Sequence, residues 1–383
     1  MAETIRAAVM TKPGSMEVQE FPWPVLEPGA MLLKIEYCGI CGTDKHTFRG
    51  ETVQYKGTPA ESTTPFPIIP GHELVGTVAE ITDEARTGLE YAGRPLKEGD
   101  RVVVCPDVAC GKCYACRNFN GYPWCENQRG YGNQMSSSVA PHLFGAWSEY
   151  MYVLPNAFTY LVPDGLPPKV AQFAELLACA FSLDQAQTGS LMDGHQFGRT
   201  LLIQGVGPLG LAHLIKARMM GADRIIVMDT FAERLEVARK FGADDTIDVS
   251  ETTVAERREL VMQYTNGRGA DTAVECAGRP EAFVEGLSLV RRGGTYIESG
   301  MYVDMGEVMV NPHLICAGNL RILGLSNHPV TAYITGMDMM LRHLDDMPLR
   351  DIVSHEYGLA DAAEAIHISQ QPESTKVVIA PWA

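Results

Sequence analysis

An alternation of strand-like and helix-like segments between residues 200 and 300 constrains the fold of this chain more than any other feature. Apolar β-like runs, TLLIQ, RIIVMD, ADTAVECAG and GGTYIESG, recur along this stretch, and the first two are followed by the helical runs PLGLAHLIKARMMG and FAERLEVARKFG. A helix between consecutive buried strands lets those strands run parallel. The pattern therefore predicts an α/β fold with a doubly wound parallel sheet in this region.

The first strand-to-helix transition carries a G-x-G-x-x-G motif, formed by Gly205, Val206, Gly207, Pro208, Leu209 and Gly210. The first glycine permits a tight turn, the second lets backbone approach a pyrophosphate, and the third allows close packing of helix on strand. The N-terminus of the helix favours the negative charge of the phosphates. In this context the motif predicts a dinucleotide site; the alternative is a packing turn that binds nothing.

Two charged residues after the glycines bear on which dinucleotide binds. Asp229 ends the next strand, about twenty residues beyond the motif. A carboxylate there can accept hydrogen bonds from the ribose hydroxyls of NAD and would repel the 2′-phosphate of NADP, so we predict NAD as the cofactor. Arg234, in the following helix, is a candidate for binding the cofactor, or else it lies on a solvated helix face.

Four closely spaced cysteines, Cys110, Cys113, Cys116 and Cys125, have the spacing C-x2-C-x2-C-x8-C. Four thiolates on one short lobe can close a tetrahedral zinc site, which would be structural because it has no open position. Two disulfides or free thiols are the alternatives. The absence of a secretory signal pattern predicts a reducing, cytoplasmic location, in which zinc is the more common use of such a cluster.

The overall composition excludes several classes of partner. The chain has 383 residues, 46% of them hydrophobic, and a formal net charge of −16. An acidic surface argues against nucleic acid and anionic membranes as partners. No stretch approaches the roughly 20 apolar residues that span a bilayer. We therefore predict a globular protein that acts on a small molecule.

A second metal site is predicted near the N-terminus, in a part of the chain that is rich in short β-like segments. The run CGICGTDKHTF holds Cys41, Thr43, Asp44 and His46, and the run GHELVG holds His72 and Glu73. A cysteine and a histidine on separate loops, with a third ligand, would form an open zinc site with room for a substrate oxygen. Further β-like segments are residues 31–40, 73–81, 100–106, 149–155 and 375–381, and residues 170–186 are expected to be helical.

Together these motifs resemble those of the zinc-containing medium-chain alcohol and polyol dehydrogenases, in particular the sorbitol and threonine branches. The resemblance rests on CGICGTDKH, GHELVG, the four-cysteine lobe, GAWSEY followed by VPDGL, GVGPLG with Asp229, and GRGAD with ECAG. It implies a GroES-like catalytic domain at 1–179, a Rossmann NAD-binding domain at 180–325, and a return to the catalytic domain at 326–383. It also implies a homodimer or homotetramer.

The resemblance further implies roles for individual residues. Cys41 and His72 are expected to bind the catalytic zinc, and Glu73 to approach or transiently coordinate it. For the third ligand, the run LLACAFS resembles the cysteine version of the family and favours Cys179, whereas FAELL resembles the polyol version and would choose Glu175.

The remaining roles concern catalysis. Asp44 is expected to fix the imidazole of His72. Thr43 is expected to take the substrate proton and pass it, through the nicotinamide ribose, to His46. Trp147, Phe66 and Tyr131 are candidate walls of the substrate pocket.

The predicted function is zinc-dependent hydride transfer between NAD and a secondary alcohol, polyol or hydroxy amino acid. Two alternatives share the fold: a zinc-free quinone or enone reductase, and a nucleotide-binding protein without catalysis. The presence of both cysteine-containing motifs argues against a zinc-free reductase. The presence of Cys41, Thr43, His46 and His72 together argues against a nucleotide-binding protein without catalysis.

Overall fold

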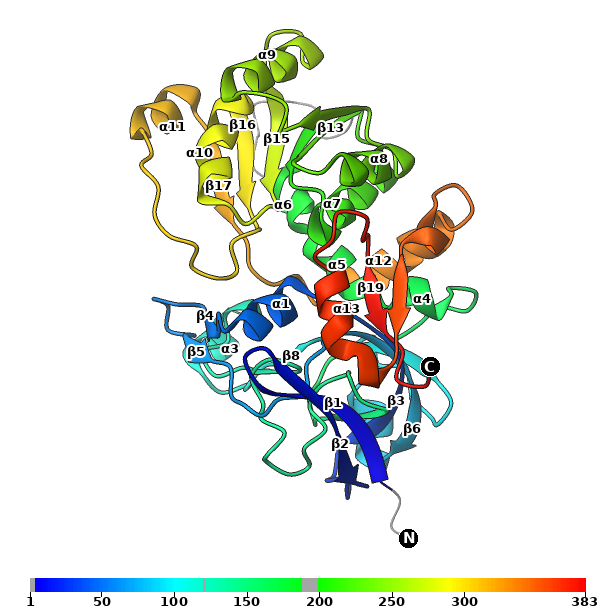
Figure 1. Cartoon of the computed structure of the whole chain (residues 1–383). Helices are drawn as coiled ribbons and strands as arrows, with labels where there is room; N and C mark the ends of the chain where they lie inside the picture. Colours follow the sequence, from blue (N-terminus) through cyan, green and yellow to red (C-terminus); the bar gives the residue numbers. More distant parts are fainter. Residues whose placement is uncertain (1–3, 120–121, 188–198) are drawn as a thin grey trace. The chain divides into compact units, whose positions relative to one another are not determined.

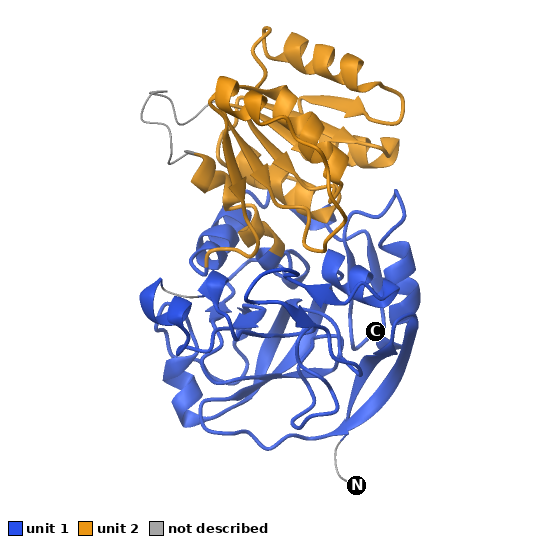
Figure 2. Ribbon diagram, turned by 90° about the vertical axis from the view of Figure 1, so that its left-hand side faces the viewer, with its two compact units in different colours: residues 1–175, 330–345, 349–383 blue, residues 176–329, 346–348 orange. Residues whose placement is uncertain are grey.

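The computed structural model describes residues 4–119, 122–187 and 199–383, which form two compact units (Figure 2). Unit 1 comprises Met1–Glu175, Val330–Asp345 and Leu349–Ala383, and unit 2 comprises Leu176–Pro329 and Asp346–Pro348. No helix in the described part of the chain combines the length and apolar character needed to cross a membrane.

Unit 1 is built on a mixed sheet of seven strands with the order β11-β7-β6-β3-β19-β18, in which β10 also pairs with β3. The strand β19 comes from the far end of the chain and pairs antiparallel with β3 (Figure 1). The strands of this sheet are β3 (Met31–Gly39), β6 (Glu73–Ile81), β7 (Arg101–Val104), β10 (Tyr150–Val153), β11 (Thr159–Leu161), β18 (His355–Tyr357) and β19 (Val377–Ile379). Shorter ladders pair β1 (Thr4–Lys12) with β2 (Ser15–Pro22), β4 (Val53–Gln54) with β5 (Ser62–Thr63), and β8 (Asp107–Val108) with β9 (Arg129–Gly130).

Short helices complete unit 1. They are α1 (Gly42–Arg49), α2 (Asp83–Gly88), α3 (Tyr114–Asn118), α4 (Pro168–Ala171), α12 (Ala332–Arg342) and α13 (Ala362–Ile368), with single 3-10 turns at Tyr122–Trp124, Leu349–Asp351 and Leu359–Asp361. Trp147 and Tyr131 are completely buried in the core of this unit, and Phe66 packs against that core. The suggestion that these aromatic residues line a substrate pocket is therefore replaced by a packing role for Trp147 and Tyr131.

Unit 2 contains six parallel strands with the order β14-β13-β12-β15-β16-β17, which confirms the predicted doubly wound sheet. The order reverses between β12 and β15. Helices α7 and α8 cover one face and α9 and α10 the other (Figure 1). The strands are β12 (Thr200–Gln204), β13 (Arg224–Asp229), β14 (Asp245–Asp248), β15 (Ala270–Glu275), β16 (Val290–Glu298) and β17 (Arg321–Gly324). The helices are α6 (Ser182–Gln187), α7 (Pro208–Met219), α8 (Ala232–Lys240), α9 (Val254–Tyr264), α10 (Pro280–Leu289) and α11 (Pro312–Gly318).

The helical segment expected over 170–186 is divided into three short helices, α4, α5 (Ala174–Cys179) and α6. Between α5 and α6, the N–H of Ala180 bonds to the carbonyl of Leu177, and the N–H of Phe181 to that of Ala178. These bonds span three residues rather than four, so the backbone tightens and changes direction between helices. The boundary between the two units falls within α5.

Candidate active site and metal centres

Cys41 is the N-cap residue of α1, and Asp44 in the first turn of that helix fixes its backbone. One carboxylate oxygen of Asp44 accepts the N–H of Cys41 at 2.8 Å, and the other accepts the N–H of Gly71 at 3.3 Å. Because Gly71 directly precedes His72, this single buried side chain holds together the two loops that carry the predicted ligands. Burial raises the pKa of Asp44.

His72 is 5% exposed, and its Nδ1 has no hydrogen-bond partner among the described residues. Burial alone would lower the pKa of His72, but the adjacent Cys41 sulfur and the carboxyl groups of Asp44 and Glu175 outweigh it and raise this pKa well above its ordinary value. A buried imidazole is thus surrounded by groups that favour a positive charge. That charge can be supplied by a proton or by a metal ion, and the thiolate, imidazole and carboxylate set fits zinc.

Glu73 forms a fully buried ion pair with Lys376, which precedes β19. The ammonium of Lys376 also donates to the carbonyl of Ile40 at 3.0 Å, next to Cys41. Room for this pair depends on Gly39, because a Cβ atom there would collide with the carboxylate of Glu73 and the side chain of Lys376. Sequence reasoning identified Glu73 and missed Lys376, which lies more than three hundred positions away and has no motif of its own.

The two candidates for the third ligand lie one turn apart on α5. Glu175 is 8% exposed, and its carboxylate interacts electrostatically with Glu73, His72 and Lys376 of unit 1. Burial and the charge of Glu73 raise the pKa of Glu175 to about 7. Cys179 belongs to unit 2, where its sulfur lies 3.7 Å from Nδ1 of His328.

The residues predicted to carry the substrate proton lie on α1. The hydroxyl oxygen of Thr43 is 3.7 Å from the Cys41 sulfur. His46 contacts the carboxylate of Glu51 through Nδ1, and Arg49 contacts both, at 3.0 Å to Nδ1 and 3.1 Å to the carboxylate. Burial lowers the pKa of His46. Glu51 was missed by sequence reasoning, although an acid five residues after a candidate relay histidine could have suggested it.

The four cysteines of the zinc motif converge as predicted from their spacing. The sulfur atoms of Cys110, Cys113, Cys116 and Cys125 all lie within 4.8 Å of one another, and none forms a disulfide. Backbone N–H groups point at the sulfurs: Cys110 donates to Cys125 at 3.2 Å, Cys113 to Cys110 at 3.3 Å, and Cys116 to Cys113 at 3.4 Å. Such bonds stabilise thiolates, so the donor set and its surroundings fit a closed tetrahedral zinc site.

Cys105, close to this lobe in the sequence, stands apart from the four sulfurs. It is completely buried, and its thiol donates to the hydroxyl of Tyr122 at 3.0 Å. Burial raises the pKa of the Cys105 thiol strongly, which disfavours the thiolate that a metal needs.

In unit 2, the glycine motif forms the turn between β12 and α7. Gly205 has φ +87°, and a Cβ atom there would collide with Ala277, so only glycine fits. Asp229 holds this turn: one carboxylate oxygen accepts the N–H of Val206 at 2.7 Å and the other the N–H of Phe231 at 3.0 Å. Each oxygen keeps lone pairs for a further donor, so Asp229 both shapes the turn and remains able to accept from a ribose hydroxyl.

Comparison with known proteins agrees with this arrangement. The Alcohol dehydrogenase GroES-like domain family matches residues 27–164, and the Zinc-binding dehydrogenase family matches residues 208–341. The chain is 32% identical to an L-threonine 3-dehydrogenase from Pyrococcus horikoshii, with 99% of both chains covered. The chain belongs to the zinc-containing medium-chain alcohol dehydrogenases. It is therefore an oxidoreductase of the kind that acts on CH–OH donors.

Two further relatives of this dehydrogenase extend over its whole length. A 5-exo-hydroxycamphor dehydrogenase from Pseudomonas putida is 30% identical, with 98% of both chains covered. The crystal structure of an alcohol dehydrogenase from Thermotoga maritima superposes with a TM-score of 0.88 at 30% identity, covering 99% of each chain. The predicted combination of a GroES-like domain and a doubly wound sheet is thereby confirmed.

Arg234 of this dehydrogenase is not simply a solvated residue of α8. Its guanidinium lies 4.9 Å from the ring centroid of Phe231, and its Nε is buried without a hydrogen-bond partner among the described residues. A Cβ atom on Gly207 would come within 3.9 Å of its Nη1. A cationic group so close to the second glycine of the motif is available to a phosphate or an adenine ring.

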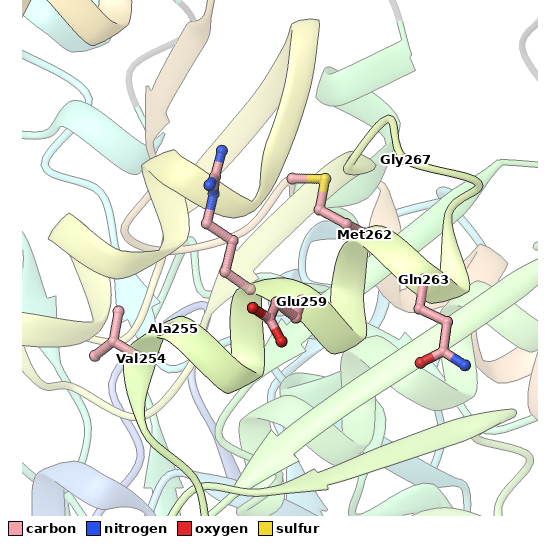
Figure 3. Close-up of a pocket in the computed structure, with 7 residues that line it drawn as sticks. Val254, Ala255, Glu259, Met262, Gln263 and Gly267 are labelled. Carbon is pink, nitrogen blue, oxygen red and sulfur yellow. The ribbon is translucent and has the colours of Figure 1, made fainter.

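A pocket elsewhere in unit 2 is lined by none of the predicted site residues. It runs along the outer side of α9 (Figure 3) and is lined by Val254, Ala255, Arg258, Glu259, Met262, Gln263 and Gly267. Its residues come from one helix and the turn after it. A surface of one helix with opposite charges side by side is typical of a solvated face.

Proposed function

We propose that this dehydrogenase oxidises a secondary alcohol with NAD, using one catalytic and one structural zinc ion per chain. The observation that carries the proposal is the buried cluster in unit 1, where Cys41, His72 and Glu175 interact electrostatically and the Nδ1 atom of His72 is left without a partner. Buried polar groups are seldom left unsatisfied, so an orphaned ring nitrogen beside a thiol and a carboxyl supports a metal position.

The bound groups would supply the central chemistry: zinc lowers the pKa of an alcohol oxygen, and the nicotinamide accepts a hydride. The chain's own residues would orient the substrate and take the proton of its hydroxyl group. Thr43, beside the Cys41 sulfur, can accept a hydrogen bond from the substrate hydroxyl. The pairing of Glu51 with Nδ1 of His46 leaves Nε2 of that ring free to accept a proton, and a low pKa for His46 keeps it neutral and ready near pH 7.

Glu175 is proposed as the third protein ligand, although the sequence resemblance favours Cys179, a prediction that stays untested. The reason is that the carboxylate of Glu175 interacts electrostatically with His72 within unit 1. We expect Glu175→Gln to weaken zinc binding at the catalytic site by at least about 100-fold, beyond the 10–100-fold loss that follows removal of an outer-sphere partner. Cys179→Ala should change it far less. Zinc competition with a chromogenic chelator measures both, and the reverse ranking would restore Cys179 as the ligand.

A preference for NAD over NADP is proposed from Asp229, whose carboxylate would meet the 2′-phosphate of NADP. Juxtaposed like charges cost several kcal/mol, so Asp229→Asn should narrow the ratio of the two dissociation constants by about 100-fold. The amide can still accept from Val206 or Phe231, so the turn should survive. Equilibrium titration with both reduced cofactors measures the ratio.

The matched control for this substitution is Asp248→Asn, because Asp248 lies beside Asp229 in the parallel ladder at the end of the next strand. This control should leave the ratio unchanged. A wild-type protein that binds NADP more tightly than NAD would contradict the assignment.

A secondary alcohol is proposed as substrate because the names of the relatives found, a hydroxycamphor and an L-threonine 3-dehydrogenase, both describe secondary hydroxyl groups. The testing experiment is NAD reduction across cyclic alcohols, polyols and hydroxy amino acids, with and without a zinc chelator, alongside metal analysis. We expect about two zinc ions per chain and chelator-sensitive turnover. Turnover of alcohols that persists in zinc-free protein would contradict a catalytic zinc ion. Assembly into a homodimer or homotetramer, and a cytoplasmic location, stay predictions.

A further inference from the structure

Two carboxyl groups lie side by side at the end of the parallel sheet in unit 2. Glu275 is the last residue of β15 and Glu298 the last residue of β16, and they are direct partners in the ladder between these strands. Directly opposed residues of a parallel pair point to the same face of the sheet, so both side chains share one space. A Cβ atom on Gly300 would collide with Oε2 of Glu275, which places this oxygen against the turn that follows Glu298.

The donors that face these carboxyl groups, among the described residues, are backbone N–H groups. Glu275 is completely buried; its Oε1 accepts the N–H of Ala277 at 2.7 Å, but Oε2 has no hydrogen-bond partner among the described residues. Glu298 is half-buried. Among the described residues, neither oxygen of Glu298 has a partner in good hydrogen-bond geometry, although the backbone N–H groups of Gly300 and Met301 act to lower its pKa. Two carboxylates that are direct neighbours in a ladder repel each other, and a proton held between them removes one charge and satisfies one orphaned oxygen.

Among the described residues, no lysine, arginine or histidine side chain is a main influence on the pKa of either carboxyl group. Burial and the charges of Glu275 and Glu298 raise the pKa values of two neighbouring groups, Cys276 and Tyr296. The charge of Glu285, on α10, also raises the pKa of Tyr296. The carboxylate of Glu285 already forms an ion pair with Arg257 of α9, at 2.6 Å. Burial and the charge of Glu275 raise the pKa of Glu298 to about 8, and burial raises that of Glu275. Near neutral pH the pair therefore holds one proton and one negative charge.

The position of the pair relates it to the cofactor. In a doubly wound sheet a dinucleotide lies across the carboxyl ends of the strands where their order reverses, here between β12 and β15. Asp229 ends β13 and marks the half that takes the adenosine ribose, so the other nucleotide lies over the half that contains β15 and β16. Glu275 and Glu298 end these two strands.

We propose that Glu275 and Glu298 form a proton-sharing pair next to the nicotinamide half of the site, and that this pair favours the oxidised cofactor by releasing its proton when NAD⁺ binds. This inference rests on the proposed function. The nicotinamide ring of NAD⁺ is positively charged and that of NADH is neutral, so only the oxidised form stabilises the doubly ionised pair.

The sign of the pH dependence follows from this difference. NAD⁺ lowers the pKa of the pair, so its binding releases a proton and tightens as pH rises toward the pKa of the free protein. The gain is about tenfold in affinity for each unit by which NAD⁺ lowers that pKa. NADH should show no such gain, so the preference for NAD⁺ over NADH should grow with pH.

The test is calorimetric titration of the zinc-loaded protein with NAD⁺ and with NADH, in two buffers of different ionisation enthalpy and over a range of pH. In wild-type protein, NAD⁺ should release up to about one proton more than NADH does. Glu298→Gln, whose amide can donate to Glu275, should remove this excess and flatten the pH dependence of NAD⁺ affinity. Glu275→Gln should also remove the excess.

The control is Glu281→Gln, an exposed acid in the first turn of α10, which should behave as wild type. If Glu298→Gln keeps the full excess of released protons, or if NADH releases as many as NAD⁺, the inference is overturned while the proposed function stands. If neither dinucleotide binds wild-type protein, the proposed function fails and the inference fails with it.

Discussion

Cys41→Ser should abolish nearly all turnover and leave NAD⁺ affinity almost unchanged. Cys41 adjoins His72 in unit 1, whereas the glycine turn and Asp229 belong to unit 2. A serine hydroxyl is a poor zinc ligand, so the site should lose its metal or hold it in the wrong geometry. We expect a loss in kcat/KM larger than the roughly 10–100-fold that follows damage to an outer-sphere partner. Steady-state kinetics, cofactor titration and metal analysis measure the three effects.

The control for this change is Cys316→Ser, which makes the same substitution at an exposed cysteine of α11. It should retain two zinc ions and full activity. Wild-type rates in Cys41→Ser would remove this residue from the catalytic zinc site. A parallel loss of NAD⁺ binding would show instead that the substitution disturbs the whole fold.

Cys113→Ser is expected to have the opposite signature, with a large loss of stability and a smaller direct effect on the chemistry. The sulfur of Cys113 both belongs to the four-sulfur cluster and accepts the N–H of Cys116, so its loss opens a closed site. Loss of a structural metal belongs to the few changes that cost more than about 4 kcal/mol. For a unit of this size that corresponds to a decrease in Tm of roughly 8–16 °C. Thermal unfolding by circular dichroism measures it.

Two comparisons separate stability from chemistry in this variant. Cys316→Ser should melt as wild type, and Cys113→Ser should keep most of its kcat at temperatures well below its Tm. A variant that melts normally and is inactive would assign the four-cysteine lobe to catalysis. A normal Tm together with two bound zinc ions would show that Cys113 is not a ligand.

The parts of the fold that the sequence predicted well are those whose causes are local. The turn at Gly205 and the start of α7 at Pro208 follow from residues that are neighbours in the chain, because the glycine supplies a positive φ and proline suits the first helical turn. The convergence of the four cysteine sulfurs is equally local, within sixteen residues from Cys110 to Cys125. The division of 170–186 into three helices was missed, because an apolar run of this kind satisfies helical periodicity whether or not the backbone tightens between turns.

The site was predictable where a residue belonged to a motif and unpredictable where its partner came from afar. Cys41 and His72 belong to recognisable runs, and the structure brings them together. Lys376, which neutralises Glu73, lies in an ordinary strand-like segment, and Glu298 becomes notable only when its register with Glu275 is known. Such pairs are fixed by tertiary packing, and no short pattern encodes a contact between segments so far apart.

The hydrogen bond from Lys376 to Ile40 closes a loop of 336 residues, and it has a consequence for the order in which the chain assembles. Strand β19 and the ammonium group beside Glu73 are among the later parts of the polypeptide to be synthesised. Unit 2, which is almost continuous in sequence, can complete its sheet before they exist. Until β19 is synthesised, Glu73 therefore lacks the ammonium group that neutralises it in the folded unit, so the surroundings of Glu73 can be completed only late in assembly.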